Sequence, residues 1–194
     1  MPAKVKRADV PITAADQALA EHVLREKFNE FRTRWQRQAY DVVIDTATAL
    51  KNWPALAAVH GNMGDRYARG NDAESLHLAA EQYKLAADFC REFEANHGEE
   101  IRHSAKLKEA HWKCTLAWTF KRSGHADQGF EAAQDALQEA RGERGEGEPG
   151  PNFRGEAEAM KTLGALHQNM GDFDEAQECY VNAHRHSVLC ACDF

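Results

Sequence analysis

Residues 163–184, LGALHQNMGDFDEAQECYVNAH, place a glycine inside a stretch that otherwise has the pattern of an amphipathic helix. Gly164 destabilises such a helix by about 1 kcal/mol relative to alanine. Because paired antiparallel helices approach closely only where a small residue removes the obstructing Cβ, we interpret Gly164 as a point of close helix contact. Gly171 has a different role: we expect it to end the first helix in the left-handed conformation, with Asp172 and Glu175 capping the next helix.

The composition is that of a globular protein. The chain has 194 residues, of which 43% are hydrophobic and 28% charged, so it can bury a core as one domain or as a short repeat array. Acidic residues outnumber lysine and arginine by 31 to 24, and the formal net charge is −7. A protein that binds nucleic acid through bulk electrostatics carries a surplus of basic residues instead, so we expect no nucleic-acid partner.

The sequence also indicates where the protein resides. No segment has the roughly 18 consecutive apolar residues that a membrane span requires, so we expect no membrane partner. The N-terminal residues MPAKVKRADVPI are basic but lack a following apolar core, which argues against a secretory signal. The five cysteines are scattered and odd in number, as expected for reduced thiols. These features predict a cytoplasmic protein and leave a nuclear location open.

The residue types predict an all-α fold. Helix-favouring alanine, glutamate, leucine, lysine and glutamine dominate, and three of the five prolines lie at the N-terminal edge or near a helix start, while two share one linker. We expect a flexible N-terminus at 1–12, one long amphipathic helix at 13–52 and a helical repeat domain at 53–194. Within that domain, the glycine- and charge-rich segment at 142–152 predicts a mobile loop.

Turn residues divide the repeat domain into helices. The first runs through LAAVHGNMGDRYARG at 56–70, with Pro54 suited to its first turn, and the second ends near Gly98. Asn71 and Glu74, three residues apart, resemble a capping box at the start of the second helix. The remaining helices are expected at 101–122, 126–141, 153–170 and 173 to about 189.

The N-terminal segment at 13–52 carries a single apolar stripe. Its members recur at three- and four-residue steps: Leu19, Val23, Leu24, Phe28, Phe31, Trp35, Ala39, Val42 and Val43. The pattern fits one long helix or two helices with a bend. Such a helix either caps the repeat domain or projects as a coiled-coil arm, and Trp35 on the stripe favours capping.

The last helix pair carries a repeat pattern. Its marker residues are Met160, Leu163, Gly164, His167, Gly171, Phe173, Ala176, Tyr180 and Ala183. This pattern resembles the tetratricopeptide repeat, in which a large residue, Leu-Gly, an aromatic residue, a turn glycine and Ala-x3-aromatic-x2-Ala follow one another. Met160 stands where tryptophan is usual, and His167 stands where tyrosine is usual.

Two earlier helix pairs carry less regular copies. One has three extra residues before its second helix and carries Met63, Gly64, Tyr67, Gly70, Ala79, Tyr83 and Ala86. The middle copy lacks the second-helix aromatic residue, which Phe130 can replace, and carries Leu116, Ala117, Phe120, Gly124, Gly129, Ala133 and Ala136. The small residues Gly64, Ala117 and Gly164 are 53 and 47 residues apart, against about 34 in compact repeats. The copies are therefore similar to the long-helix repeats of kinesin light chain and LGN.

The resemblance implies a right-handed superhelical stack of antiparallel helix pairs. The concave face of such a stack is lined by the first helices and binds a peptide or a partner helix. The resemblance thus implies a non-catalytic scaffold or adaptor within a larger assembly, with another protein as partner. Candidate contacts are first-helix residues that the packing pattern does not use: Asn62, Asp65, Arg69, His111, Trp118, Lys121, Arg122, Lys161, Gln168 and Asn169. Trp118 is the strongest anchor candidate, and plain core packing is its alternative role.

The carboxylate clamp of co-chaperone repeats can be tested on the same alignment. That clamp requires lysine, arginine and asparagine residues at set first-helix positions. At the matching positions this chain has Gly61, Asp65, Thr115, Glu158 and Thr162. We therefore do not expect it to bind chaperone tails.

Metal binding and catalysis are the other classes of function to weigh. HRHSVLCAC at 184–192 contains four residues of types that bind zinc: His184, His186, Cys190 and Cys192. Helical residues two apart point about 200° from each other, so the two histidines cannot face one ion, and we prefer an ordinary helix surface to a metal-binding module. The sequence has no HExxH helix, P-loop or GxGxxG turn. We expect no catalytic residue, metal or cofactor.

The last helix is expected to leave apolar side chains uncovered. A helical repeat array needs a terminal element with a polar outer face, yet Tyr180, Val188 and Leu189 would remain open there. Either the chain is part of a longer array or this end docks onto another subunit. Docking on a second copy predicts a homodimer with these three residues as contacts.

Overall fold

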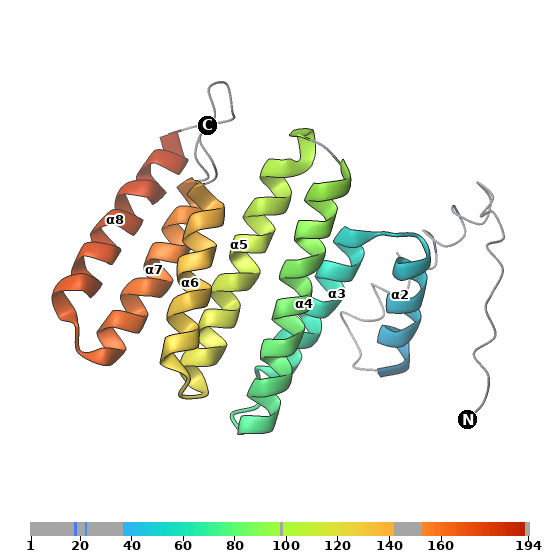
Figure 1. Ribbon diagram of the computed structural model, residues 1–194, viewed down its shortest axis with the longest axis horizontal. Helices are drawn as coiled ribbons and strands as arrows, with labels where there is room; N and C mark the ends of the chain where they lie inside the picture. The colour runs from blue at the N-terminus through green and yellow to red at the C-terminus, as the bar shows by residue number, and fades with distance from the viewer. Residues whose placement is uncertain (1–17, 19–21, 23–36, 98, 142–152, 193–194) are drawn as a thin grey trace. The chain divides into compact units, whose positions relative to one another are not determined.

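The computed structural model describes residues 18, 22, 37–97, 99–141 and 153–192 (Figure 1). The predicted flexible N-terminus, most of the 13–36 segment and the predicted loop at 142–152 lie outside these described residues. The chain divides into two compact units, Met1–Asn52 and Trp53–Phe194.

The described residues are almost entirely helical, and the ranges 37–97, 99–141 and 153–192 contain no strand, which confirms the all-α prediction. None of the helices in these ranges combines the length and the apolar character that crossing a membrane requires. The helices are α2 (Arg37–Ala49), α3 (Trp53–Tyr67), α4 (Ala73–His97), α5 (Glu99–Arg122), α6 (Ala126–Arg141), α7 (Phe153–Met170) and α8 (Phe173–Cys192).

In the unit Met1–Asn52, the described structure is mainly α2. Lys51 follows the helix with a φ of 50°, and the Asn52 amide donates to the carbonyl oxygen of Ala47. Val43 is buried, as expected for the apolar stripe, but Val42 is 43% exposed. The prediction for Val42 was wrong because Val42 and Val43 are adjacent and project about 100° apart on a helix, so a narrow stripe holds only one of them.

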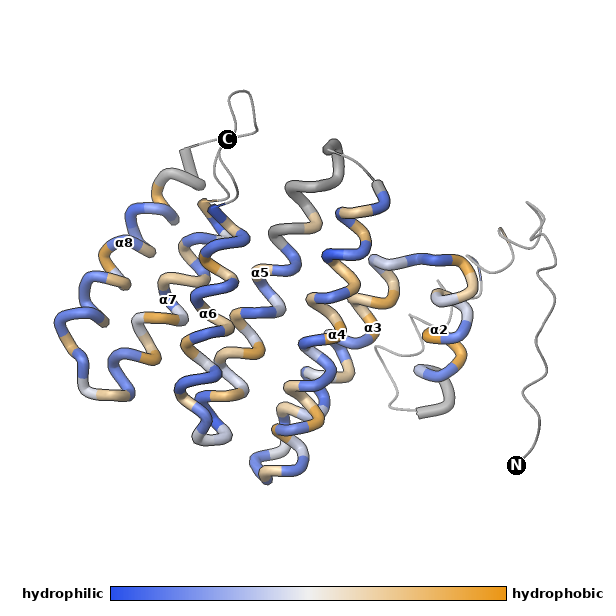
Figure 2. The backbone as a smooth tube through the Cα atoms, in the orientation of Figure 1, coloured by the Kyte–Doolittle hydropathy of each residue, from blue (hydrophilic) through white to orange (hydrophobic). Residues whose placement is uncertain are grey.

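The unit Trp53–Phe194 consists of three helix pairs, α3–α4, α5–α6 and α7–α8, which follow one another side by side (Figure 1). Hydrophilic and hydrophobic residues are interspersed along the coloured parts of the helices (Figure 2), as expected for helices that are partly buried and partly exposed. One core cluster runs through four of the helices and comprises Ala79, Ala80, Tyr83, Leu116, Ala117, Ala132, Ala133, Leu163 and Leu166. The pairs therefore share a continuous core.

Glycine in the left-handed conformation ends α5 and α7. Gly124 and Gly171 have φ angles of 82° and 91°. After Gly171, the Asp172 amide donates to the carbonyl oxygen of His167, and the Gly171 amide donates to that of Gln168. This is the Schellman arrangement, and it confirms the expected C-terminal role of Gly171.

The helices of the first and last pairs meet at a glycine. A Cβ built on Gly64 would lie 2.6 Å from the ring of Tyr83, and one on Gly164 would lie 3.0 Å from the ring of Tyr180. The Tyr83 hydroxyl also donates to Asp65 over 2.8 Å. The predicted reason for these glycines is confirmed, because a tyrosine from the second helix occupies the space that a side chain would need.

In the middle pair, the two helices approach closely through different residues. Ala117 replaces the glycine, and a Cβ on Gly129 of α6 would lie 3.1 Å from the carbonyl oxygen of Ala117. Phe130 packs edge-on against His167 of α7, with ring centroids 4.7 Å apart. Close approach here rests on two small residues, and the aromatic ring of Phe130 contacts the next helix pair.

Several helix ends differ from the sequence predictions: α2 ends at Ala49 and α3 at Tyr67, each three residues earlier than predicted. The N-cap of α4 is Asp72, whose Oδ1 accepts from the Ser75 amide over 2.8 Å. Asn71 instead accepts from Arg122, so the next residue with capping chemistry takes its place. Helix α5 begins at Glu99, two residues earlier than predicted, and α8 continues to Cys192.

Replacing Gly64 with alanine tests the glycine–tyrosine contact. We expect Gly64→Ala to lower the free energy of unfolding by about 1–2 kcal/mol, because overpacking against the buried Tyr83 ring outweighs the better helix propensity of alanine. The measurement is chemical denaturation followed by circular dichroism. Asp135→Ala, at an exposed position in α6, is the control and should be neutral or slightly stabilising. A Gly64→Ala protein more stable than the wild type would contradict the contact.

Candidate functional site

The exposed side of the first helices α3, α5 and α7 holds the predicted binding residues. On α5, His111, Trp118 and Arg122 recur at helical spacing and therefore lie on one side. His111 reaches Glu158 on α7, and Arg122 reaches the turn after α3. Side chains thus link the three helices across one surface, which we call the first-helix face.

His111 lies near the charged groups of the first-helix face. Its Nδ1 is 2.8 Å from Oε1 of Glu158. The hydrogen bond to Glu158 raises the pKa of His111, burial lowers it, and the charge of Asp65 raises it further, while Arg154 opposes this. Groups from α3, α5 and α7 therefore converge at His111.

Trp118 is a surface residue rather than a core residue. Its side chain is 39% exposed, and the Nζ of Lys121 lies 4.7 Å from the centre of its ring. This is cation–π geometry. The tryptophan that packs inside is Trp112, whose ring stacks on Tyr83 with centroids 5.9 Å apart and fills the space above Gly61.

Arg122 is used within the fold. Its guanidinium donates to the carbonyl oxygens of Ala68 and Gly70 over 2.7 and 3.2 Å, and to Oδ1 of Asn71 over 2.6 Å. These bonds fasten the end of α5 to the α3–α4 turn. The sequence predicted Arg122 as a partner contact, whereas its donors already bind backbone and side-chain oxygens.

The other candidates fall into two groups. Asn62, Asp65 and Gln168 are engaged: Asn62 donates to the carbonyl oxygen of Ala58, and the other two accept from Tyr83 and Tyr180. Three candidates are exposed, and their side chains form no hydrogen bond or ion pair with another described residue: Arg69, Lys161 and Asn169. The structure therefore leaves mainly positive charge available on the first-helix face.

Glu158 and Arg154 belong to the first-helix face, but the sequence did not identify them as binding residues. Both lie on the side of α7 that carries Lys161, at spacings of three and seven residues. That spacing was the available signal. Their proximity to His111 depends on how α5 and α7 pack, which periodicity alone does not reveal.

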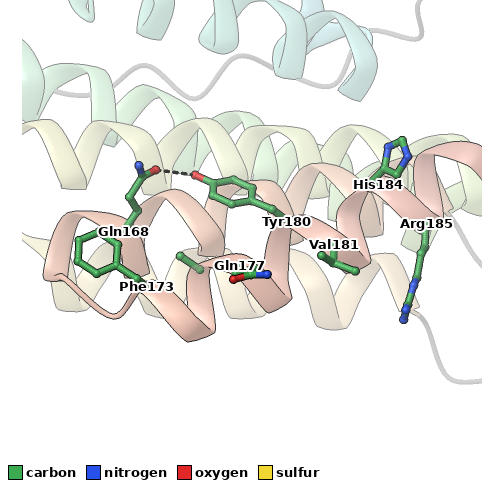
Figure 3. A pocket seen from close by; sticks show the side chains of 8 residues that line it. Gln168, Phe173, Gln177, Tyr180, Val181, His184 and Arg185 are labelled. Carbon is green, nitrogen blue, oxygen red and sulfur yellow. Dashed lines mark hydrogen bonds between the residues drawn. The ribbon is translucent and has the colours of Figure 1, made fainter.

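A second surface feature is a shallow groove of about 500 Å³ along α8 (Figure 3). It is lined by Gln168, Phe173, Ala176, Gln177, Tyr180, Val181, His184 and Arg185. Tyr180 and Val188, predicted as self-association contacts, are 37% and 48% exposed. The side chain of Leu189 lies outside the described residues.

The described cysteines and histidines do not form a metal site. No group of three histidine, cysteine or acidic residues that could hold a metal occurs in the described part of the chain. His184 lines the α8 groove, whereas His186 faces Glu156, with Nδ1 3.4 Å from Oε2. Burial raises the pKa of the Cys90 and Cys114 thiols to about 12.

Buried carboxylates join the helices behind these surfaces. Oε1 of Glu109, a residue 1% exposed, lies 3.0 Å from Nη2 of Arg91 and 3.1 Å from Nζ of Lys113. Lys113 continues to Glu139 of α6 over 3.6 Å. This chain of charges ties α4, α5 and α6 together.

No protein-family model matches the chain, and no curated protein is significantly similar to it in sequence.

Histidine titration tests the geometry of the first-helix face. We expect the pKa of His111 to lie above 6.5, and Glu158→Gln to lower it because the carboxylate that favours the protonated ring is lost. Since the folded-state pKa is raised, the interaction stabilises the fold below pH 6.5 and fades as pH rises through the folded pKa.

His60 is the internal control for this titration. Burial lowers the pKa of His60 below 6.5, although the hydrogen bond to Gln82 opposes this. The unfolded chain therefore binds a proton more readily than the folded protein does, so the fold loses stability as pH falls below 6.5. Nuclear magnetic resonance of the ring protons measures both residues. A His111 pKa that does not respond to Glu158→Gln would contradict the arrangement, whereas His60 should not change.

Proposed function

We propose that this protein is a non-catalytic interaction scaffold of the tetratricopeptide-repeat kind, which binds a peptide or helix of another protein on its first-helix face. The single observation that carries this proposal is the exposed Trp118 ring beneath Lys121, on a helix linked by side chains to both neighbouring first helices. Tryptophan presented in this way is the residue type most often dominant in protein interfaces.

The repeat assignment is supported by a recurring contact. In the first and last pairs, a first-helix glycine receives a second-helix tyrosine, and the tyrosine hydroxyl donates back to the first helix at Asp65 or Gln168. The same geometry on the same kind of residue favours repeated units. We propose that the pairs form a right-handed superhelical stack whose concave side is the first-helix face.

The charges of the first-helix face favour an acidic partner segment. Arg69, Arg154 and Lys161 are exposed, while the negative groups Asp65 and Glu158 already accept hydrogen bonds from Tyr83 and from His111. A segment with carboxylates flanking an apolar residue matches this surface, because the apolar residue can cover Trp118. The raised pKa values of the buried cysteines keep those thiols protonated at neutral pH, which supports a non-catalytic role.

The test uses peptides selected against the full chain. A displayed library of random peptides is panned on residues 1–194, and the affinities of the selected peptides are measured by fluorescence anisotropy. We expect acidic peptides with an apolar centre, and we expect Trp118→Ala to weaken them about thirtyfold, which is about 2 kcal/mol. Lys161→Glu should weaken the same peptides by a smaller factor.

Phe173→Ala is the matched control because it also removes an exposed aromatic ring, but from α8. It should leave the affinities unchanged. Peptides that bind Trp118→Ala as tightly as the wild type would overturn the proposal, as would selected peptides whose binding depends on Phe173 instead.

A further inference from the structure

One side of α8 is left uncovered by the helices of its own unit. Helix α7 packs along the opposite side, where Ala176 and Ala183 are buried, whereas Phe173 is 68% exposed and Val181 43% exposed. In the first pair, Tyr83 occupies the position that corresponds to Tyr180 of α8. Tyr83 is 1% exposed because Trp112 of α5 stacks on it. Tyr180 has no such cover among the described residues.

The order of residues along this side of α8 is self-complementary. The exposed stripe consists of Phe173, Gln177, Tyr180, Val181, His184 and Val188. Read from either end, its positions are apolar, polar, apolar, polar and apolar, with Tyr180 and Val181 at the centre. When two copies lie antiparallel and cross at the centre of the stripe, Phe173 meets Val188, Gln177 meets His184, and Tyr180 meets Val181. Apolar side chains then face apolar ones, and polar side chains face polar ones.

The charges beside the stripe are complementary in the same orientation. The acidic Asp174 and Glu178 lie on one edge in the first half of α8, and Arg185 lies on that edge in the second half. All three are exposed. In the antiparallel arrangement, Arg185 of one copy falls between Asp174 and Glu178 of the other, since those two residues are one helical turn apart.

We propose that the open side of α8 binds α8 of a second copy of this chain, antiparallel and related by a two-fold axis near Tyr180 and Val181. Each partner contributes the same surface, so the contact closes as a dimer. The stripe spans about 24 Å of helix. We expect a weak dimer whose dissociation constant lies in the micromolar range. This proposal concerns a surface other than the first-helix face and stands independently of the proposed function.

Analytical ultracentrifugation of residues 1–194 in reducing buffer, over a range of concentrations, tests the dimer. The wild type should shift from monomer to dimer as concentration rises. Val181→Glu should raise the dimer dissociation constant at least tenfold, because it places a charge at the centre of the contact. Leu85→Glu, at an aliphatic residue of similar exposure on α4, is the control and should leave the dissociation constant unchanged.

Charge reversal tests the orientation. Arg185→Glu alone should weaken the dimer about tenfold, and adding Asp174→Lys and Glu178→Lys to it should restore most of the affinity. A parallel dimer would show no such rescue, because Arg185 would then not lie beside Asp174 and Glu178 of the other copy. Circular dichroism confirms that each variant remains helical.

Three outcomes overturn the proposal. The first is a wild type that stays monomeric up to hundreds of micromolar, which would leave the α8 side to a different partner or to another segment. The second is a dimer that neither Val181→Glu nor Arg185→Glu weakens. The third is a dimer that both variants weaken but that the triple charge reversal does not restore.

Discussion

The helix pairs depend on one contact, in which a tyrosine ring of one helix packs against a glycine of the other. It occurs twice, at Gly64 with Tyr83 and at Gly164 with Tyr180, and it sets how near the two helices of a pair approach. Helices this close can share a core of alanine and leucine, because little space is left for larger residues. The glycines weaken their own helices locally, so the stability of each pair comes from packing rather than from helix propensity.

Polar contacts then fasten one pair to the next. Arg122 ties the end of α5 to the turn of the preceding pair, and the His111–Glu158 contact ties α5 to α7. Because these side chains lie on the exposed side of the first helices, fixing the pairs also gathers charge on one surface. The surface proposed to bind a partner is therefore assembled by the same bonds that align the pairs. The surface is basic because its acids are engaged: Glu158 contacts His111, and Asp65 accepts from the Tyr83 hydroxyl.

The helices could be predicted closely from the sequence because glycine and proline mark their ends: α6 and α7 have the predicted bounds. The role of Gly64 was also predictable, since only a close contact explains glycine inside a helix. The choice between Trp112 and Trp118 as buried residue was not, because it depends on the packing of α5 against α3 and α4. Likewise, Asn71 failed as N-cap because a residue 51 positions away occupies its side chain.

The exposure of Tyr180 follows from the geometry of its helix pair. In both pairs that have a glycine–tyrosine contact, one side of the tyrosine ring faces away from its own glycine, and in the first pair Trp112 of the following helix covers that side. A further pair stacked on α8 would provide the same cover and would expose a new tyrosine or its equivalent in turn. Two copies meeting through a two-fold axis would instead cover both Tyr180 rings at once. The alternation of apolar and polar residues along α8 suits this second solution, because a stacked pair would have no need of a stripe that reads alike in both directions.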